Sequence, residues 1–172
     1  GYLVSHKQIL GILSLLIAMV GYVPYIANVL KGKTKPHAYT WLTWEVLAII
    51  GFGIQLKGGG GPGTWLLGLT TLMTMLIFLL SLRYGHKEIH AIDTISLGFA
   101  GIAFIFWIYA DRPLVAAILI SIIEAVGGFF PTFRKSYKLP NEETLTSYVG
   151  YTISTVLALI ALDNRSAELI IY

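Results

Sequence analysis

The sequence predicts an all-α integral membrane protein in which two parallel three-helix repeats are joined by a linker helix (3+1+3). Hydrophobic residues make up 56% of the 172 residues and charged residues only 12%, whereas a soluble domain carries about 25% charged residues. The mean hydropathy is +0.75, and successive apolar segments are long enough to cross roughly 30 Å of hydrocarbon. A pattern of small residues and proline also recurs at an offset of 107 residues, which places Ser14 on Ser121.

Six apolar segments are predicted to span the membrane, at about 8–30, 38–56, 64–82, 92–110, 113–133 and 144–162. The glycine run 58–61 and Pro62-Gly63 separate the second and third spans, because this composition does not continue a helix. Pro113 opens the fifth span at a first-turn position, where its missing N–H costs little. The apolar residues 167–172 are expected to begin a seventh span that the sequence truncates. The first repeat is therefore 1–90, the linker helix 91–111 and the incomplete second repeat 112–172.

The basic residues predict the orientation of the chain. Eight of the twelve lysines and arginines follow spans one, three and five: Lys31, Lys33, Lys35, Arg83, Lys87, Arg134, Lys135 and Lys138. The positive-inside rule puts these loops in the cytoplasm and the N-terminus outside. The net charge of +3 is small and lies in loops, so it indicates topology rather than nucleic-acid binding. The absence of cysteine excludes disulfides and thiolate metal sites.

An internal repeat is indicated by residues that agree at one offset: Ser14 with Ser121, Ala18 with Ala125, Gly21 with Gly128, Pro24 with Pro131, Trp41 with Tyr148 and Trp44 with Tyr151. The small residues and proline recur at helical spacing, so they form one stripe of each helix. Small residues on one stripe let membrane helices approach closely. The alternative to a true repeat is that these matches between two apolar helices arose by chance. With an odd linker between them, the two triplets have the same orientation, as in parallel transporter repeats.

These residues resemble the SWEET/PQ-loop transporter superfamily, through Pro24 followed by Lys31-Gly32-Lys33 and Thr40-Trp41, and through Pro131 followed by Lys138 and Ser147-Tyr148. The namesake Pro-Gln pair is absent, since Tyr25 and Thr132 follow the two prolines. The resemblance implies a 3+1+3 fold and a solute pocket lined by aromatic residues of the second and sixth spans. The superfamily includes carriers of different solutes and non-transport receptors, so the resemblance does not name a solute.

Two pairs of residues are predicted to line a solute site. Trp41 and Glu45 are four residues apart in the second span, and Tyr148 and Thr152 have the same spacing in the sixth. Residues at this spacing share one helix face, and an aromatic wall with a few polar groups is typical of a small-solute site. The alternative for Trp41 and Tyr148 is an interfacial aromatic belt, because both lie near a predicted cytoplasmic loop.

Glu124 is the strongest sequence signal of function. It lies roughly 16 Å from the start of its predicted helix, at 1.5 Å per residue, near the middle of the bilayer. A carboxylate there costs several kcal/mol unless it is protonated, paired or facing water. The corresponding residue of the first repeat is Ile17, so the architecture does not require an acid. Proton coupling through Glu124 is one hypothesis, and a permanently protonated acid that hydrogen-bonds a neighbouring helix is the other.

Pro24 and Pro131 are hinge candidates, because a proline frees a helix carbonyl; helix termination is the alternative. No catalytic constellation is present, and the sequence predicts neither an enzyme nor a cofactor, metal or nucleic acid. The expected partners are the lipid bilayer and a small polar solute, and a homo-oligomer or membrane-complex partners stay open. The sequence thus favours a secondary transporter that works by alternating access. The competing hypothesis is a non-transport subunit, receptor or scaffold.

Overall fold

The computed structural model describes residues 4–129, 137 and 145–172, and all the regular secondary structure in these ranges is helical. The helices are α1 (His6–Leu30), α2 (Ala38–Lys57), α3 (Trp65–Tyr84), α4 (Ala91–Ala110), α5 (Pro113–Glu124), α7 (Leu145–Ala161) and the single turn α8 (Ala167–Ile170). A 3₁₀ turn, Gly61–Thr64, precedes α3, and a π-helical turn, Ala125–Phe129, follows α5. Within these described residues, three helices are long and apolar enough to cross a membrane: α1, α3 with its 3₁₀ turn, and α4.

Local sequence accounts for where several helices begin. Ser5 and Gln8 form a capping box at the start of α1, in which each side chain accepts a hydrogen bond from the other residue's backbone N–H. These bonds satisfy N–H groups that have no partner inside the helix. Pro113 is the first residue of α5, as expected. The predicted fifth span is not one regular α-helix, because its α-helical hydrogen bonding gives way to the π turn after Glu124.

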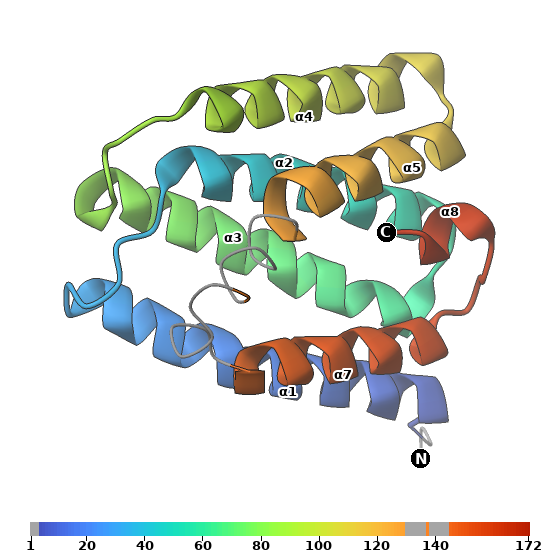
Figure 1. Ribbon diagram of the computed structural model, residues 1–172. Helices are drawn as coiled ribbons and strands as arrows, with labels where there is room; N and C mark the ends of the chain where they lie inside the picture. The colour runs from blue at the N-terminus through green and yellow to red at the C-terminus, as the bar shows by residue number, and fades with distance from the viewer. Residues whose placement is uncertain (1–3, 130–136, 138–144) are drawn as a thin grey trace.

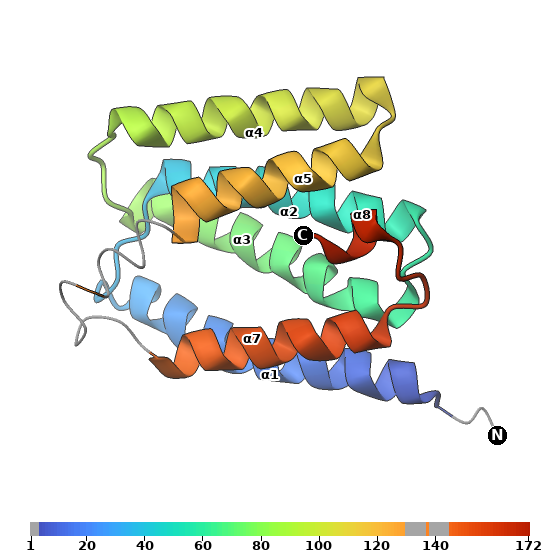
Figure 2. The same ribbon diagram turned by 45° about the vertical axis from the view of Figure 1, so that its right-hand side comes forward.

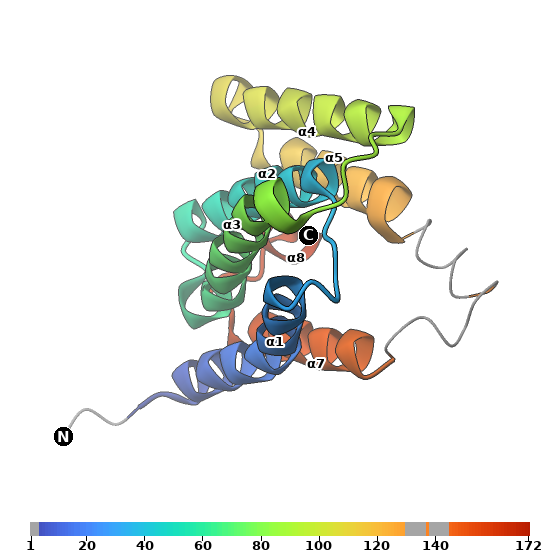
Figure 3. The same cartoon turned by 90° about the vertical axis from the view of Figure 1, so that its left-hand side faces the viewer.

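The first three helices are not arranged in chain order. α3 packs against both α1 and α2 and lies between them (Figure 1). α1 runs along α7, while α2 packs against α5, and α4 covers the outer side of α2 and α5 (Figure 3). The first helix of each predicted repeat therefore contacts the second helix of the other.

Alanines allow close packing where α2, α4 and α5 meet. Ala100 and Ala103 of α4 and Ala116 and Ala117 of α5 are fully buried against Leu47 and Ile50 of α2. Small side chains at this junction let the three helices approach within van der Waals contact, which drives helix association in the absence of a hydrophobic effect. Large apolar side chains of α4, such as Phe99 and Ile102, are exposed on its outer side.

The glycine loop between α2 and α3 holds one end of the bundle together. Asp163, which follows α7, donates its backbone N–H to the Gly60 carbonyl at 2.9 Å, and Asn164 Nδ2 donates to the Gly58 carbonyl at 2.7 Å. A Cβ on Gly63 would lie 2.5 Å from the Ala158 carbonyl oxygen. The absence of a side chain at Gly63 therefore allows the backbones of the 3₁₀ turn and α7 to meet.

Candidate functional site

Glu124 lies at the last position of α5, immediately before the π turn. Its side chain is half-buried, and Glu124 Oε2 accepts a hydrogen bond of 2.7 Å from the Tyr172 hydroxyl. A π turn adds a residue to the helical ring and so changes the direction of the side chains that follow, and such turns are frequent at functional sites. The acid therefore lies at an irregularity in its helix rather than in a uniform apolar segment.

Tyr172 reaches Glu124 because the C-terminal segment turns back into the bundle. This segment passes between α2 and α5 on one side and α7 on the other (Figures 1 and 2). Gln55 Nε2 donates to the Leu169 carbonyl at 2.9 Å, and Ser121 Oγ donates to the Ile171 carbonyl at 3.2 Å. A Cβ on Gly51 would lie 2.5 Å from the Tyr172 ring. The glycine thus leaves the room in which this ring packs against α2.

Two further tyrosines lie near the acid. Tyr22 of α1 and Tyr151 of α7 both lie within electrostatic range of Glu124, of each other and of Tyr172. We call Tyr22, Glu124, Tyr151 and Tyr172 the acid–tyrosine cluster. Tyr22, Glu124 and Tyr172 are half-buried, and Tyr151 is 42% exposed, so the described residues do not fully enclose the cluster. Its members come from both predicted repeats, so the cluster lies at the junction between them.

Glu45, an acid in the interior of α2, is almost completely enclosed. Its side chain is only 2% exposed, and its Oε2 accepts a hydrogen bond from the Thr74 hydroxyl of α3. Thr74 Oγ1 also lies 2.8 Å from the Thr70 carbonyl. Because a hydroxyl carries one proton, Thr74 donates to only one of these acceptors at a time. Glu45 is therefore bound to α3 inside the first repeat.

Thr70 connects the two acidic regions. Its side chain is 8% exposed, and Thr70 Oγ1 has no hydrogen-bond partner that meets standard geometry among the described residues. The Tyr22 side chain interacts with that of Thr70. Polar groups therefore lead from one acid toward the other through the interior, in the order Glu45, Thr74, Thr70, Tyr22 and Glu124. A buried hydroxyl without a partner is costly, so Thr70 Oγ1 is a polar atom with unused bonding capacity.

The other predicted solute-site residues have separate surroundings. Trp41 is half-buried and stacks with Tyr25 of α1 at 5.3 Å and with Trp44 at 4.9 Å between ring centroids. Thr152 is an exposed residue of α7. Tyr148 belongs to α7, but its side chain lies outside the part of the chain that the structure describes. Trp41 is nevertheless linked to the cluster through α1, because Tyr25 and Tyr22 are one turn apart.

Of the two hinge candidates, Pro24 lies in the part of the chain that the structure describes. Pro24 lies inside α1, which continues to Leu30, so this proline does not terminate the helix. It leaves the carbonyl one turn earlier without its helical hydrogen bond. Pro131 lies outside the described residues.

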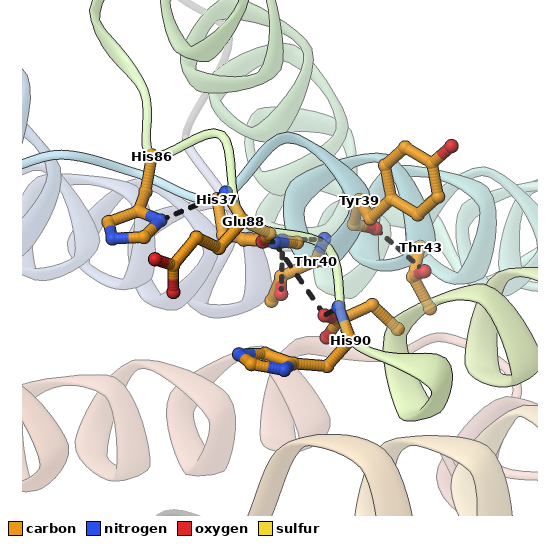
Figure 4. Close-up of polar contacts among 8 residues, drawn as sticks. His37, Tyr39, Thr40, Thr43, His86, Glu88 and His90 are labelled. Atoms are coloured by element: carbon orange, nitrogen blue, oxygen red, sulfur yellow. Dashed lines mark hydrogen bonds and ion pairs between the residues drawn. The ribbon is translucent and has the colours of Figure 1, made fainter.

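His37, His86 and His90 lie near one another (Figure 4), at the end of α2 opposite the glycine loop. His37 Nδ1 accepts from the Thr40 N–H at 3.4 Å and caps α2, while its Nε2 contacts the Glu88 carbonyl and lies 3.6 Å from Asp93 Oδ2. These contacts tie the loop that precedes α2 to the residues around the start of α4. Within the described ranges, no group of three His, Cys, Asp or Glu residues could hold a metal ion. This end therefore has a connecting role, joining the loops that precede α2 and α4.

Sequence reasoning assigned no role at the site to Tyr22, Tyr151, Tyr172 or Thr70. One signal was present: Tyr22 corresponds to Phe129 at the repeat offset, so only the first of the two positions carries a hydroxyl.

A scan of protein-family models and searches of curated proteins and solved structures found no match for this chain.

Proposed function

We propose that the protein is a multi-pass membrane carrier of a small polar solute, in which two three-helix repeats give alternating access to a site at Glu124. The observation that carries the proposal is the acid–tyrosine cluster. An acid within an apolar bundle is costly, and such residues mark substrate or proton pathways. Here the acid is hydrogen-bonded, only half-buried and located where the predicted repeats meet.

The helix arrangement supports a rocking mechanism. α1 packs on α7 and α2 packs on α5, which is the reciprocal pairing expected when two similar triplets face each other across an axis along the membrane normal. The resemblance to the SWEET/PQ-loop superfamily favours the same architecture. Pro24 provides a point at which α1 lacks a backbone hydrogen bond, and such points allow a helix to bend.

Among the described residues, hydrogen bonds and an ion pair link the predicted repeats at the end that carries the N-terminus. Lys7 of α1 donates to Asp163 Oδ1 at 3.0 Å and to the Leu162 carbonyl at 3.1 Å, and the glycine loop binds the same segment. The bundle is thus held together at the end that carries the N-terminus. Alternating access requires these contacts to separate in the other state, with Glu124 exchanging a proton or solute between the two sides.

Uptake by purified protein in lipid vesicles tests this function. A panel of radiolabelled amines, sugars, amino acids and carboxylic acids is supplied with and without a proton gradient. We expect gradient-dependent uptake of at least one class, and loss of the gradient dependence in Glu124→Gln. Glu88→Gln, which changes an exposed acid at the histidine end, is the matched control. Failure of the wild-type protein to move any of these solutes contradicts transport and leaves a non-transporting membrane subunit.

A further inference from the structure

The charges inside the bundle have one sign. All twelve lysines and arginines lie outside the six predicted spans, and so do all four histidines. The acids Glu45 and Glu124 lie well inside them. Glu45 is occupied by Thr74, whereas the described partner of Glu124 is a neutral phenol. No basic side chain of this chain is therefore positioned in a span to neutralise an ionised Glu124.

The groups around Glu124 suit a positively charged guest. A cation near a carboxylate offsets the cost of keeping that charge away from water. Aromatic rings attract ammonium groups through their faces, and cages of several rings are used to bind organic cations. Tyr172 donates a hydrogen bond to the acid, and Tyr22 of α1 and Tyr151 of α7 lie within electrostatic range of it. Thr70 Oγ1, which is buried and has no hydrogen bond of standard geometry among the described residues, adds an acceptor near Tyr22.

We propose that the acid–tyrosine cluster binds a small organic cation with an amine or ammonium group, which pairs with Glu124 and lies among the rings of Tyr22, Tyr151 and Tyr172. The inference rests on the proposed carrier function and names its substrate class. Among the described residues, no basic side chain is shown beside Glu124 to receive an anion. The cation and a proton compete for the same carboxylate, so that binding one releases the other and the carrier exchanges them.

Other ionisable groups lie on the elements that pack against α5, and we assign the proton that competes with the cation to Glu124 rather than to them. On α2, Glu45 is bonded to Thr74, and Lys57 lies over the Trp107 ring at 5.0 Å. On α4, Asp93 accepts from the His90 backbone and lies beside His37. Glu168 of α8 is in that turn's first positions. The groups facing Glu124 itself are the three phenols of the cluster, which are neutral over the ordinary pH range.

Calorimetric titration of the detergent-purified protein tests the inference with n-butylammonium and tetramethylammonium as probes, and with n-butanol and butyrate as neutral and anionic counterparts. We expect the two cations to bind, with an affinity that falls as the pH is lowered. Glu124→Gln should weaken binding by about tenfold or more, corresponding to loss of a charge-assisted contact, and should remove its pH dependence. Tyr22→Leu should weaken binding by about threefold or more through loss of one ring. Glu88→Gln should leave binding unchanged.

Binding of butanol or butyrate as tight as that of butylammonium overturns the inference. Equal affinity of wild type and Glu124→Gln for the cations, or no cation binding to the wild type, also overturns it. Thermal unfolding of each variant shows whether a loss reflects misfolding, and Tyr22→Leu provides a second variant that leaves the acid in place. Vesicle uptake separates the two proposals: uptake of only neutral or anionic solutes rejects the cation and keeps the carrier. Glu124-dependent cation binding without any uptake rejects the carrier and keeps the site.

Discussion

The two acids of the helical core lie in different kinds of environment. Glu45 is 2% exposed, and its hydrogen-bond partner Thr74 belongs to the same predicted repeat. Glu124 is half-buried, precedes a π turn, and lies near tyrosines from both repeats. Both are carboxyl groups in apolar helices, so residue type and hydropathy do not distinguish them. The difference is enclosure: Glu45 is almost completely covered, while part of Glu124 stays exposed.

In the proposed carrier, this contrast separates a packing role from an exchange role. Glu45 is hydrogen-bonded to a neighbouring helix and is connected to Glu124 through Thr74, Thr70 and Tyr22, but it is not itself exposed. A partly exposed acid where the two predicted repeats meet is the better placed of the two to exchange a proton or solute.

The largest expected effect is on uptake in vesicles. Glu124→Gln should reduce uptake of the transported solute by about tenfold or more, because an amide cannot provide the charge-assisted contact. Glu45→Gln should retain most of the uptake, since its surroundings lie within one repeat and an amide can still accept from Thr74. Equal loss of uptake in both variants, with both proteins folded, would show that the two acids act together.

The next largest effect is expected on stability, from variants that change the surroundings of Glu45. Thr74→Val leaves buried Glu45 without its hydrogen-bond donor, which should cost about 1–3 kcal/mol of unfolding free energy. The double variant Glu45→Leu/Thr74→Val removes both partners and should recover much of this loss. Chemical denaturation in detergent micelles measures the three proteins. If Thr74→Val is as stable as the wild type, the enclosed role of Glu45 is wrong.

The close approach between the 3₁₀ turn and α7 should be sensitive to a single methyl group. In Gly63→Ala, the new Cβ meets backbone atoms of Ala158 and Leu162 at 2.5 and 2.6 Å, and overpacking of this kind costs about 1–3 kcal/mol. Gly98→Ala on α4 is the matched control, because a Cβ there meets nothing within 4 Å. The midpoint of thermal unfolding should fall for Gly63→Ala and not for Gly98→Ala. A similar midpoint for both variants would contradict the close backbone contact.

The smallest expected effect on stability comes from the ion pair that joins α1 to the segment after α7. The Lys7 and Asp163 side chains are 40% and 52% exposed, and exposed pairs contribute about 0–1 kcal/mol. A double-mutant cycle of Lys7→Met and Asp163→Asn should give a coupling energy in this range that shrinks as salt is added. Coupling well above that range would mean that this end of the bundle is held far more strongly than its exposure indicates.

Helix positions were largely predictable. The second and fourth spans were predicted at 38–56 and 92–110 and are helices at Ala38–Lys57 and Ala91–Ala110. Apolar length, glycine runs and prolines determine these boundaries locally. The change from α to π hydrogen bonding after Glu124 was not predictable, because Ala125–Phe129 fits an ordinary apolar helix equally well.

The candidate site was predictable only in part. Glu124 stood out because an acid is costly in hydrocarbon, whatever surrounds it. The partners of that acid were not evident, because Tyr22, Tyr151 and Tyr172 are far apart in the chain and tyrosine is also common at membrane interfaces. Trp41 and Glu45 do share a helix face, but the sequence did not show that Glu45 bonds to α3 while Trp41 stacks on α1.

The sequence by itself determined the helical class and the approximate ends of the helices. It also showed that Glu45 and Glu124 lie inside the predicted spans, where there are no basic residues. These features were predictable because hydropathy, glycine, proline and charge act through local chemistry. Only the tertiary structure decided that α3 lies between α1 and α2, that Glu45 is enclosed, and that three distant tyrosines meet at Glu124. Those outcomes depend on which helix faces pack together, and many pairings of similar apolar faces are compatible with the same composition.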